Sequence, residues 1–295
     1  MKPSHRTLNK LLTMSKGGLV NLLDTHCTLR GEHSWVFLPL EPKGKACLVA
    51  HIDTVWDKPQ GGDSKLLIED TKKGLIYSPQ GLGADDRAGV YALLSLFYSL
   101  PPKHRPVLLF TDLEESGGEG AIEASEIFQE ELAYCTHLIE LDRKGGGECV
   151  FYSEEPLEYK EYIESFGFVE RSGTSSDISI LGPSLGLCSV NLSIGYHNEH
   201  TKSEYLSLSA MNSTIQKVHK LLSLGDLKVW ELPPYPESIH LEREWWDLEG
   251  LDPLGHIDPS QTCPKCGKEF TKEEYNLYGM CPMCGSSQQG WSYID

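Results

Sequence analysis

The stretch GLGADDRAGVYALLSLFYSL, residues 81–100, decides the fold class. Its first half places two adjacent aspartates in a glycine-rich turn. Its second half carries apolar residues at helical spacing until Pro101 and Pro102 stop the helix. Apolar runs of strand length lie on both sides, at 46–52 and 106–112. Strands that alternate with a glycine turn and a helix indicate an α/β protein.

The same alternation continues along most of the chain. We therefore expect a three-layer α/β/α sandwich whose central sheet is mixed but mainly parallel. In such folds, ligands bind at the carboxyl ends of the strands. Further strands are expected at 35–40, 137–142, 149–152 and 187–194, a hairpin at 66–79, and helices at 120–128, 157–166 and 205–224.

Composition argues against several classes of protein. The formal net charge of −17 disfavours binding to nucleic acid or to an anionic membrane, because lysine and arginine drive both. No apolar run approaches the roughly 18 residues of a membrane-spanning helix, and the N-terminal residues lack the apolar core of a secretory signal. Five cysteines are scattered singly through apolar runs, as reduced thiols are. We therefore expect a cytoplasmic protein.

Composition also predicts three parts. Residues 1–225 carry the α/β pattern and are expected to form the main domain. Residues 226–258 are rich in proline, tryptophan and acid, and we expect them to wrap onto the main domain because a free linker seldom carries tryptophan. Residues 259–295 carry two CxxC pairs.

The two CxxC pairs predict a closed metal site. Their C-x2-C-x14-C-x2-C spacing is close to that of a zinc ribbon, and four thiolates suit one structural Zn²⁺, with rubredoxin-like iron as the alternative. Because 259–295 is not strongly basic, we expect a stabilising or protein-contact role for it and not a nucleic-acid reader. The expected ligands are Cys263, Cys266, Cys281 and Cys284.

Histidines and carboxylates recur where the predicted strands end. His51 and Asp53 lie two apart at the end of one strand, so both side chains point to the same face. Asp53 is placed to hold the second ring nitrogen of a metal-bound His51. Asp85 lies in the glycine turn, where a carboxylate can reach a metal ion, and Asp86 is also readable as the N-cap of the helix.

Adjacent carboxylates follow the strand at 106–112. Glu114 and Glu115 diverge if this segment is extended, so that one can bind metal while the other faces the attacking water.

Two further strand ends offer a choice between neighbours. Asp142 is the better ligand candidate after 137–142 because it lies at the carboxyl end, whereas Glu140 lies inside the strand. His197 and His200 both follow the strand at 187–194, and either could be a ligand by its chemistry.

Five strand ends that each present a histidine or a carboxylate form a pattern that a random globular sequence would seldom show. Together they predict a metal centre at the carboxyl edge of the sheet. Zinc is favoured over magnesium because two of the ligands are imidazoles, although Co²⁺ or Mn²⁺ could occupy such a site.

With these motifs, the chain resembles the co-catalytic zinc exopeptidase superfamily, which includes peptidase T, the acetylornithine deacetylase and carboxypeptidase group, and bacterial aminopeptidases. The resemblance covers residues 45–220 and is carried by HIDTV, GLGADDRAG, EESGGEGA, LD and EHTKSE in this order. It implies a zinc exopeptidase-like fold and a dinuclear zinc-dependent hydrolase that cleaves an amide or peptide bond.

The resemblance implies two catalytic Zn²⁺ ions that share one carboxylate. The ligands of one would be His51, Asp85 and Asp142, and those of the other Asp85, Glu115 and His200. His200 is preferred to His197 because HTKSE matches the family's His-Thr or His-Ser element followed by an acid.

Further roles also come from the resemblance. Glu114 takes the position of the general base, and Asp53 the position behind the first histidine ligand. Family members hold a cis peptide after the bridging aspartate, so we expect one at Asp85-Asp86. Asp177 resembles a further acid near the pocket.

The resemblance leaves the substrate class open. Deacetylases and carboxypeptidases of this group carry a large inserted domain, and the short stretches 54–84 and 143–199 leave little room for one, so we expect no inserted lid. Lidless members are mostly aminopeptidases, which favours an aminopeptidase-like reaction on a small peptide. A deacylase or carboxypeptidase-type enzyme acting on an acylated amino acid is one alternative, and a non-catalytic binding module with a zinc ribbon is another.

Overall fold

The computed structural model describes residues 4–56, 65–224, 228–233, 260–262 and 269–271. The chain divides into two compact units, Met1–Glu237 and Ser238–Asp295. No helix within the described ranges is long and apolar enough to cross a membrane.

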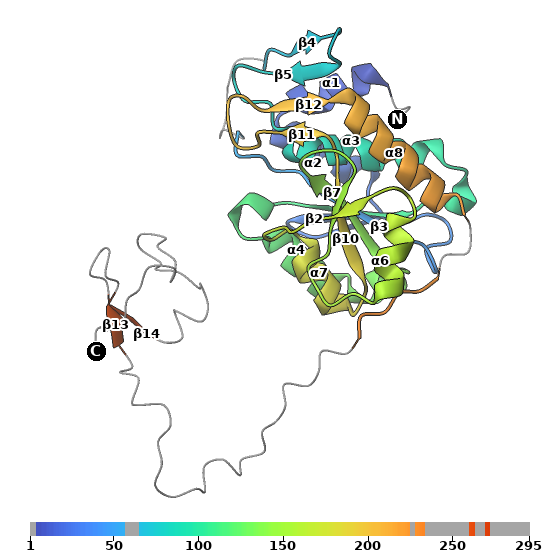
Figure 1. The fold of residues 1–295 in the computed structure, drawn as a ribbon. Coiled ribbons are helices and arrows are strands. Elements are labelled where there is room, and N and C mark those ends of the chain that lie inside the picture. Colours follow the sequence, from blue (N-terminus) through green and yellow to red (C-terminus); the bar gives the residue numbers. More distant parts are fainter. Residues whose placement is uncertain (1–3, 57–64, 225–227, 234–259, 263–268, 272–295) are drawn as a thin grey trace, which may run out of the picture. The chain divides into compact units, whose positions relative to one another are not determined.

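An eight-stranded sheet forms the middle layer of the first unit (Figure 1). Its order is β1-β2-β6-β3-β7-β10-β8-β9. The central strands β6, β3, β7 and β10 are parallel, and β2 and β8 join them antiparallel on either side, which confirms the mixed, mainly parallel sheet. The bounds are β1 (Leu29–Arg30), β2 (Ser34–Phe37), β3 (Cys47–His51), β6 (Val107–Thr111), β7 (Leu138–Arg143), β8 (Glu148–Val150), β9 (Val169–Glu170) and β10 (Ser189–Ser193).

Apolar side chains cover both faces of the central strands. In β3, Leu48 and Ala50 face one apolar cluster, while Cys47 and Val49 face the other. This two-residue period places the side chain of His51 on the same face as Cys47 and Val49. Burial on both faces is the reason that these strands are continuous apolar runs in the sequence.

Helices cover both faces of the sheet (Figure 1), which confirms the three-layer sandwich. The cluster on the Leu48 face includes residues of α1 (His5–Thr13), α2 (Lys16–His26), α3 (Ala84–Ser99), α6 (Leu157–Glu164) and α8 (Leu208–Leu222). The cluster on the Val49 face includes residues of α4 (Glu119–Ile127), α5 (Gln129–Leu132) and α7 (Ile178–Leu185).

Several helical regions differ from the sequence prediction, and α5 and α7 were not predicted at all. The N-terminal residues, to which no element was assigned, form α1 and α2, which Ser4 and Ser15 cap through their side-chain hydroxyls. The segment 205–224, expected to be one helix, begins with strand β12 (Tyr205–Ser207), and α8 begins after it because the Ser207 hydroxyl accepts a hydrogen bond from the Ala210 backbone N–H.

Strand β12 belongs to a second, four-stranded sheet of order β11-β12-β5-β4. Strands β4 (Ile68–Asp70) and β5 (Leu75–Tyr77) form the predicted hairpin, and β12 pairs with β5. Strand β11 (Tyr196–His197) pairs with β12. The connection between β11 and β12 carries His200 and Glu204, so this small sheet positions one of the expected ligands.

Of the residues that follow the expected boundary at 225, the described segment 228–233 packs on α6 through Trp230. Trp230 is buried, with its ring 5.4 Å from that of Tyr159 and 5.5 Å from that of Tyr162, and its backbone N–H donates to the Thr136 carbonyl. Trp230 lies in the segment that was expected to wrap onto the main domain.

In the second unit, β13 (Ser260–Thr262) and β14 (Glu269–Thr271) form an antiparallel pair. The four expected zinc-ribbon cysteines, Cys263, Cys266, Cys281 and Cys284, lie outside the described residues.

Candidate metal centre

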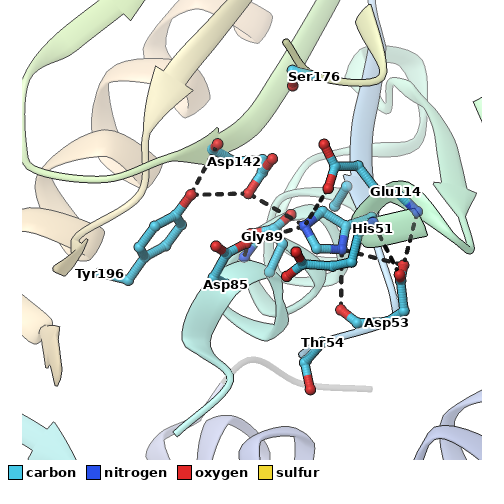
Figure 2. Close-up of polar contacts among 12 residues, drawn as sticks. His51, Asp53, Thr54, Asp85, Gly89, Glu114, Asp142, Ser176 and Tyr196 are labelled. Atoms are coloured by element: carbon cyan, nitrogen blue, oxygen red, sulfur yellow. Dashed lines mark hydrogen bonds and ion pairs between the residues drawn. The ribbon is translucent and has the colours of Figure 1, made fainter. Parts of the chain in front are cut away.

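The carboxyl ends of the parallel strands open onto a cavity of about 560 Å³. Asp85, Glu115, Asp142 and His200 line it, and His51 is fully buried beside them. Figure 2 shows the side chains of His51, Asp85, Glu114 and Asp142 converging on one point. The structure thus brings together all five expected ligands, as the topology of a parallel sheet allows.

Asp85 lies between the two histidines. Its Oδ1 is 3.1 Å from Nε2 of His51, and its Oδ2 is 3.2 Å from Nε2 of His200. The Asp85-Asp86 peptide is cis, which confirms the expectation from the resemblance. The Asp86 carboxylate instead accepts a hydrogen bond from the Gly89 backbone N–H at 2.9 Å, as the side chain of an N-cap residue does.

Asp142 reaches His51 from the end of β7, with 3.5 Å between Oδ1 and Nε2. The Tyr196 hydroxyl donates to Oδ1 and to the backbone carbonyl of Asp142, each at 3.1 Å (Figure 2). Glu140, the alternative in this strand, instead accepts a hydrogen bond from the Ser176 hydroxyl. Asp142 therefore contacts an expected ligand at the end of the strand, whereas Glu140, farther inside the strand, contacts Ser176.

The main chain of Asp142 is held by a side chain that the sequence did not single out. Asn191 on β10 accepts a hydrogen bond from the Asp142 backbone N–H at 3.0 Å and donates to its carbonyl at 3.1 Å. Asn191 also donates to the Ser176 hydroxyl at 3.0 Å, which links this clamp to Glu140. The only signal in the sequence was a polar residue inside an apolar strand.

Glu114 and Glu115 lie in the 3₁₀ turn η2 (Glu114–Ser116), so the extended conformation expected for them is wrong. Their side chains nevertheless diverge. Glu115 Oε2 is 3.1 Å from Nε2 of His200, and Glu114 Oε2 is 4.0 Å from Nε2 of His51. The Asp53 carboxylate holds the turn, because it accepts the backbone N–H groups of both glutamates at 3.2 Å.

Asp53 also lies behind His51. Nδ1 of His51 is 3.0 Å from the backbone carbonyl of Asp53 and 3.4 Å from its carboxylate Oδ1. With Nδ1 facing these acceptors, Nε2 is turned toward the acids of the centre.

Of His197 and His200, it is His200 that lies beside acids of the centre, Asp85 and Glu115. Contact with Asp85 raises the pKa of His200 to about 9. The ring of His197 stacks on Tyr205 in the second sheet, with centroids 4.8 Å apart. Asp177, the further acid of the resemblance, is fully buried and accepts a hydrogen bond from the Thr111 hydroxyl.

Negative charge is crowded in this cluster. Burial raises the pKa of Glu114, Glu115 and Asp142, and neighbouring carboxylates raise it further. For Asp85, burial opposes the charge, but the two imidazoles hold its pKa below the ordinary value. Four carboxylates thus share the cluster with two imidazoles, and cations would relieve the repulsion among the acids.

The donor set fits metal ions. His51, Asp85 and Glu115 each offer a ligand atom, and these atoms lie within 4.8 Å of one another. One carboxylate oxygen of Glu115 is buried and has no hydrogen-bond partner. Imidazole nitrogens combined with carboxylate oxygens are ligands that zinc accepts in catalytic sites.

Part of the cavity lining was not anticipated from the sequence. Arg143, Lys144 and Tyr152 line it together with the loop 172–175. Lys144 forms an ion pair with Glu199, which also lines the cavity. The cavity lining thus includes cations and hydroxyls as well as the acids of the centre.

No family model matches the chain, and no curated protein matches its sequence. Solved structures share its fold. The aminopeptidase PepT of Bacillus cereus is 15% identical, with 74% of this chain and 96% of that chain covered and a TM-score of 0.55. A tripeptidase of Staphylococcus aureus is 15% identical, with 75% and 97% covered and a TM-score of 0.56. The TET1 peptidase of Pyrococcus horikoshii is 13% identical, with 74% and 99% covered and a TM-score of 0.56.

We predict that Zn²⁺ stabilises the first unit through this cluster. At a free concentration about 100 times its dissociation constant, an ion that binds only the folded state contributes about 2.7 kcal/mol. For a unit of this size, the melting temperature should rise by about 5–10 °C relative to the chelator-treated chain. Differential scanning calorimetry measures this shift.

Asp85→Asn is the matched control, because it keeps the shape of the side chain and leaves the C-terminal cysteines untouched. Most of the shift should vanish in this variant. An equal shift in both proteins would place the zinc elsewhere.

Proposed function

We propose that this chain is a dinuclear zinc-dependent hydrolase that cleaves an amide or peptide bond in a small peptide, with an aminopeptidase-like specificity. The observation that carries the proposal is the Asp85 carboxylate, which has one oxygen toward His51 and the other toward His200, with Glu114 beside them. The fold shared with PepT and TET aminopeptidases agrees with it.

In this proposal, the expected ligands divide between two ions. Asp85 serves both, because its two oxygens face opposite imidazoles. The remaining ligands are His51 and Asp142 for one ion and Glu115 and His200 for the other. The chemistry that zinc supplies in such a site is Lewis-acid polarisation of the scissile carbonyl and of the attacking water.

Glu114 is proposed as the general acid and base. Its carboxylate lies at the cavity, and burial raises its pKa, which makes it a better proton acceptor than a solvated glutamate. It would take the proton of the attacking water at one carboxylate oxygen and return it to the nitrogen of the leaving amine. Asp53 supports both Glu114 and a proposed ligand, because it accepts the Glu114 backbone N–H and lies against Nδ1 of His51.

We predict that Glu114→Gln retains the zinc content of the wild type and lowers kcat at least about 100-fold, since the amide cannot accept the proton. Steady-state kinetics and metal analysis of the same preparation measure the two quantities. His51→Ala should lose activity and metal together. Turnover by pure Glu114→Gln at the wild-type rate would remove Glu114 from this role.

The substrate class is open to a direct comparison. We predict hydrolysis of short peptides with a free amino terminus and at least about tenfold lower kcat/KM for the same peptides after N-acetylation, because an aminopeptidase site discriminates through the amine. Both sets are assayed under one condition with free ninhydrin-reactive amine or mass as the readout. Faster cleavage of acylated amino acids would assign the chain to the deacylases instead.

We propose that residues 259–295 form a zinc ribbon behind a catalytic domain at 1–225 and a linker at 226–258. Its fit to a closed tetrahedral site rests on the spacing of Cys263, Cys266, Cys281 and Cys284. We also propose that the ribbon contacts a protein partner and that the protein is cytoplasmic.

We predict that the purified chain carries up to three zinc ions, two in the centre and one in the ribbon. Replacing Cys263 and Cys266 by serine should remove one ion and leave hydrolysis intact. Elemental analysis against protein concentration gives the count. One ion in the wild type, lost on replacement of the cysteines, would favour a non-catalytic binding module.

A further inference from the structure

Glu204 is a buried carboxylate with four hydrogen-bond donors around it. It is 1% exposed and lies four residues after His200. Its Oε1 accepts the backbone N–H groups of Ala84 at 2.6 Å and Asp85 at 3.2 Å. Its Oε2 accepts the backbone N–H of Gly83 at 2.9 Å and the indole N–H of Trp56 at 3.1 Å.

These donors belong to the turn that presents Asp85. Gly83 has φ +65°, a left-handed conformation, and the chain enters α3 directly afterwards. The backbone N–H groups of three consecutive residues at this turn donate to one carboxylate. Because Glu204 lies in the loop that carries His200, this loop fixes the direction of the Asp85 backbone.

The fourth donor brings in a third segment. Trp56 lies three residues after Asp53, and its indole packs on Gly81 so closely that a Cβ at that position would collide with the ring. The N–H of this indole is bonded to Glu204. Glu204 lies in the loop that carries His200. It therefore binds both the turn that carries Asp85 and the segment that follows His51.

We infer that Glu204 is a positioning residue that sets the mutual placement of the Asp85, His51 and His200 segments, and hence the affinity of the centre for divalent metal. This inference rests on the proposed metal site. A carboxylate is required, because each of its oxygens accepts two donors. An amide keeps only one accepting oxygen and turns an NH₂ group toward two N–H groups.

A merely structural glutamate of the same kind is available for comparison. Glu123 on α4 accepts the backbone N–H groups of Glu32 at 2.7 Å and His33 at 2.8 Å, and the Ser34 hydroxyl donates to it as well. It holds a surface turn and touches none of the proposed ligands among the described residues. Glu123→Gln therefore makes the same chemical change as Glu204→Gln, at a site away from the proposed ligands.

The test measures the Zn²⁺ affinity of the full chain by competition with a chromophoric chelator. Zinc that the Asp85→Asn variant still binds is assigned to sites other than this centre, and the remainder is the Asp85-dependent binding. Glu204→Gln should weaken the Asp85-dependent affinity at least about tenfold, the range seen for groups that support metal ligands. Glu123→Gln should keep the wild-type affinity. Urea denaturation of the metal-free proteins should show a loss of stability in both variants.

Trp56→Phe provides a second variant, which keeps Glu204 and the ring over Gly81 but removes one donor. We expect a few-fold weaker affinity, smaller than for Glu204→Gln. If Glu204→Gln fails to fold, this variant decides the question. Wild-type affinity in Trp56→Phe, or equal losses of affinity in Glu204→Gln and Glu123→Gln, would overturn the inference. Absence of Asp85-dependent zinc binding in the wild type would instead refute the proposed metal site.

Discussion

The position of one carboxylate, that of Asp85, constrains the rest of the first unit. Its oxygens lie against His51, at the end of a central strand, and against His200, in a loop of the second sheet. A single side chain therefore joins two sheets. Three further acids crowd around it, and burial together with their mutual repulsion raises the pKa of each. Burying several carboxylates together raises the free energy of the folded protein unless cations bind among them. This is the physical basis for interpreting the cluster as a metal centre.

Polar groups at the carboxyl edge of the sheet form hydrogen bonds with one another beside this cluster. On the face of the sheet that His51 shares, Thr111 bonds Asp177, Ser176 bonds Glu140, and Asn191 bonds Ser176 and the backbone of Asp142. These contacts occupy the end of an otherwise apolar layer between the sheet and α7. Hydrogen bonds around the ligands favour fixed ligand directions, as a metal site requires.

The central sheet and the strand ends could be predicted because long apolar runs and glycine turns are local signals. His51, Asp85 and Glu115 follow from them directly, and the structure places their ligand atoms together. The second sheet could not be predicted, since β11 and β12 are two and three residues long and the helical pattern of 205–224 conceals the second of them. Asn191 is a single polar residue whose role depends on a partner far away in the chain, so no spacing reveals it. Glu204 is the acid of the HTKSE element, but its bonds to the turn at 83–85 could not be inferred from that motif. The choice of Asp142 over Glu140 rested on its position at the strand end and on the resemblance, and the contacts of both side chains give its physical reason.

A common fold thus carries a particular arrangement of charge, and the proposed hydrolysis is assigned to Asp85, the two imidazoles beside it and Glu114. The central claim is that two metal ions lie on either side of Asp85. X-ray diffraction of crystals of the full chain grown with Zn²⁺, recorded on both sides of the zinc absorption edge, tests this most directly. The account predicts two anomalous peaks flanking the Asp85 carboxylate, one beside His51 and one beside His200. A map with no peak at Asp85, or with zinc at the C-terminal cysteines alone, would contradict it.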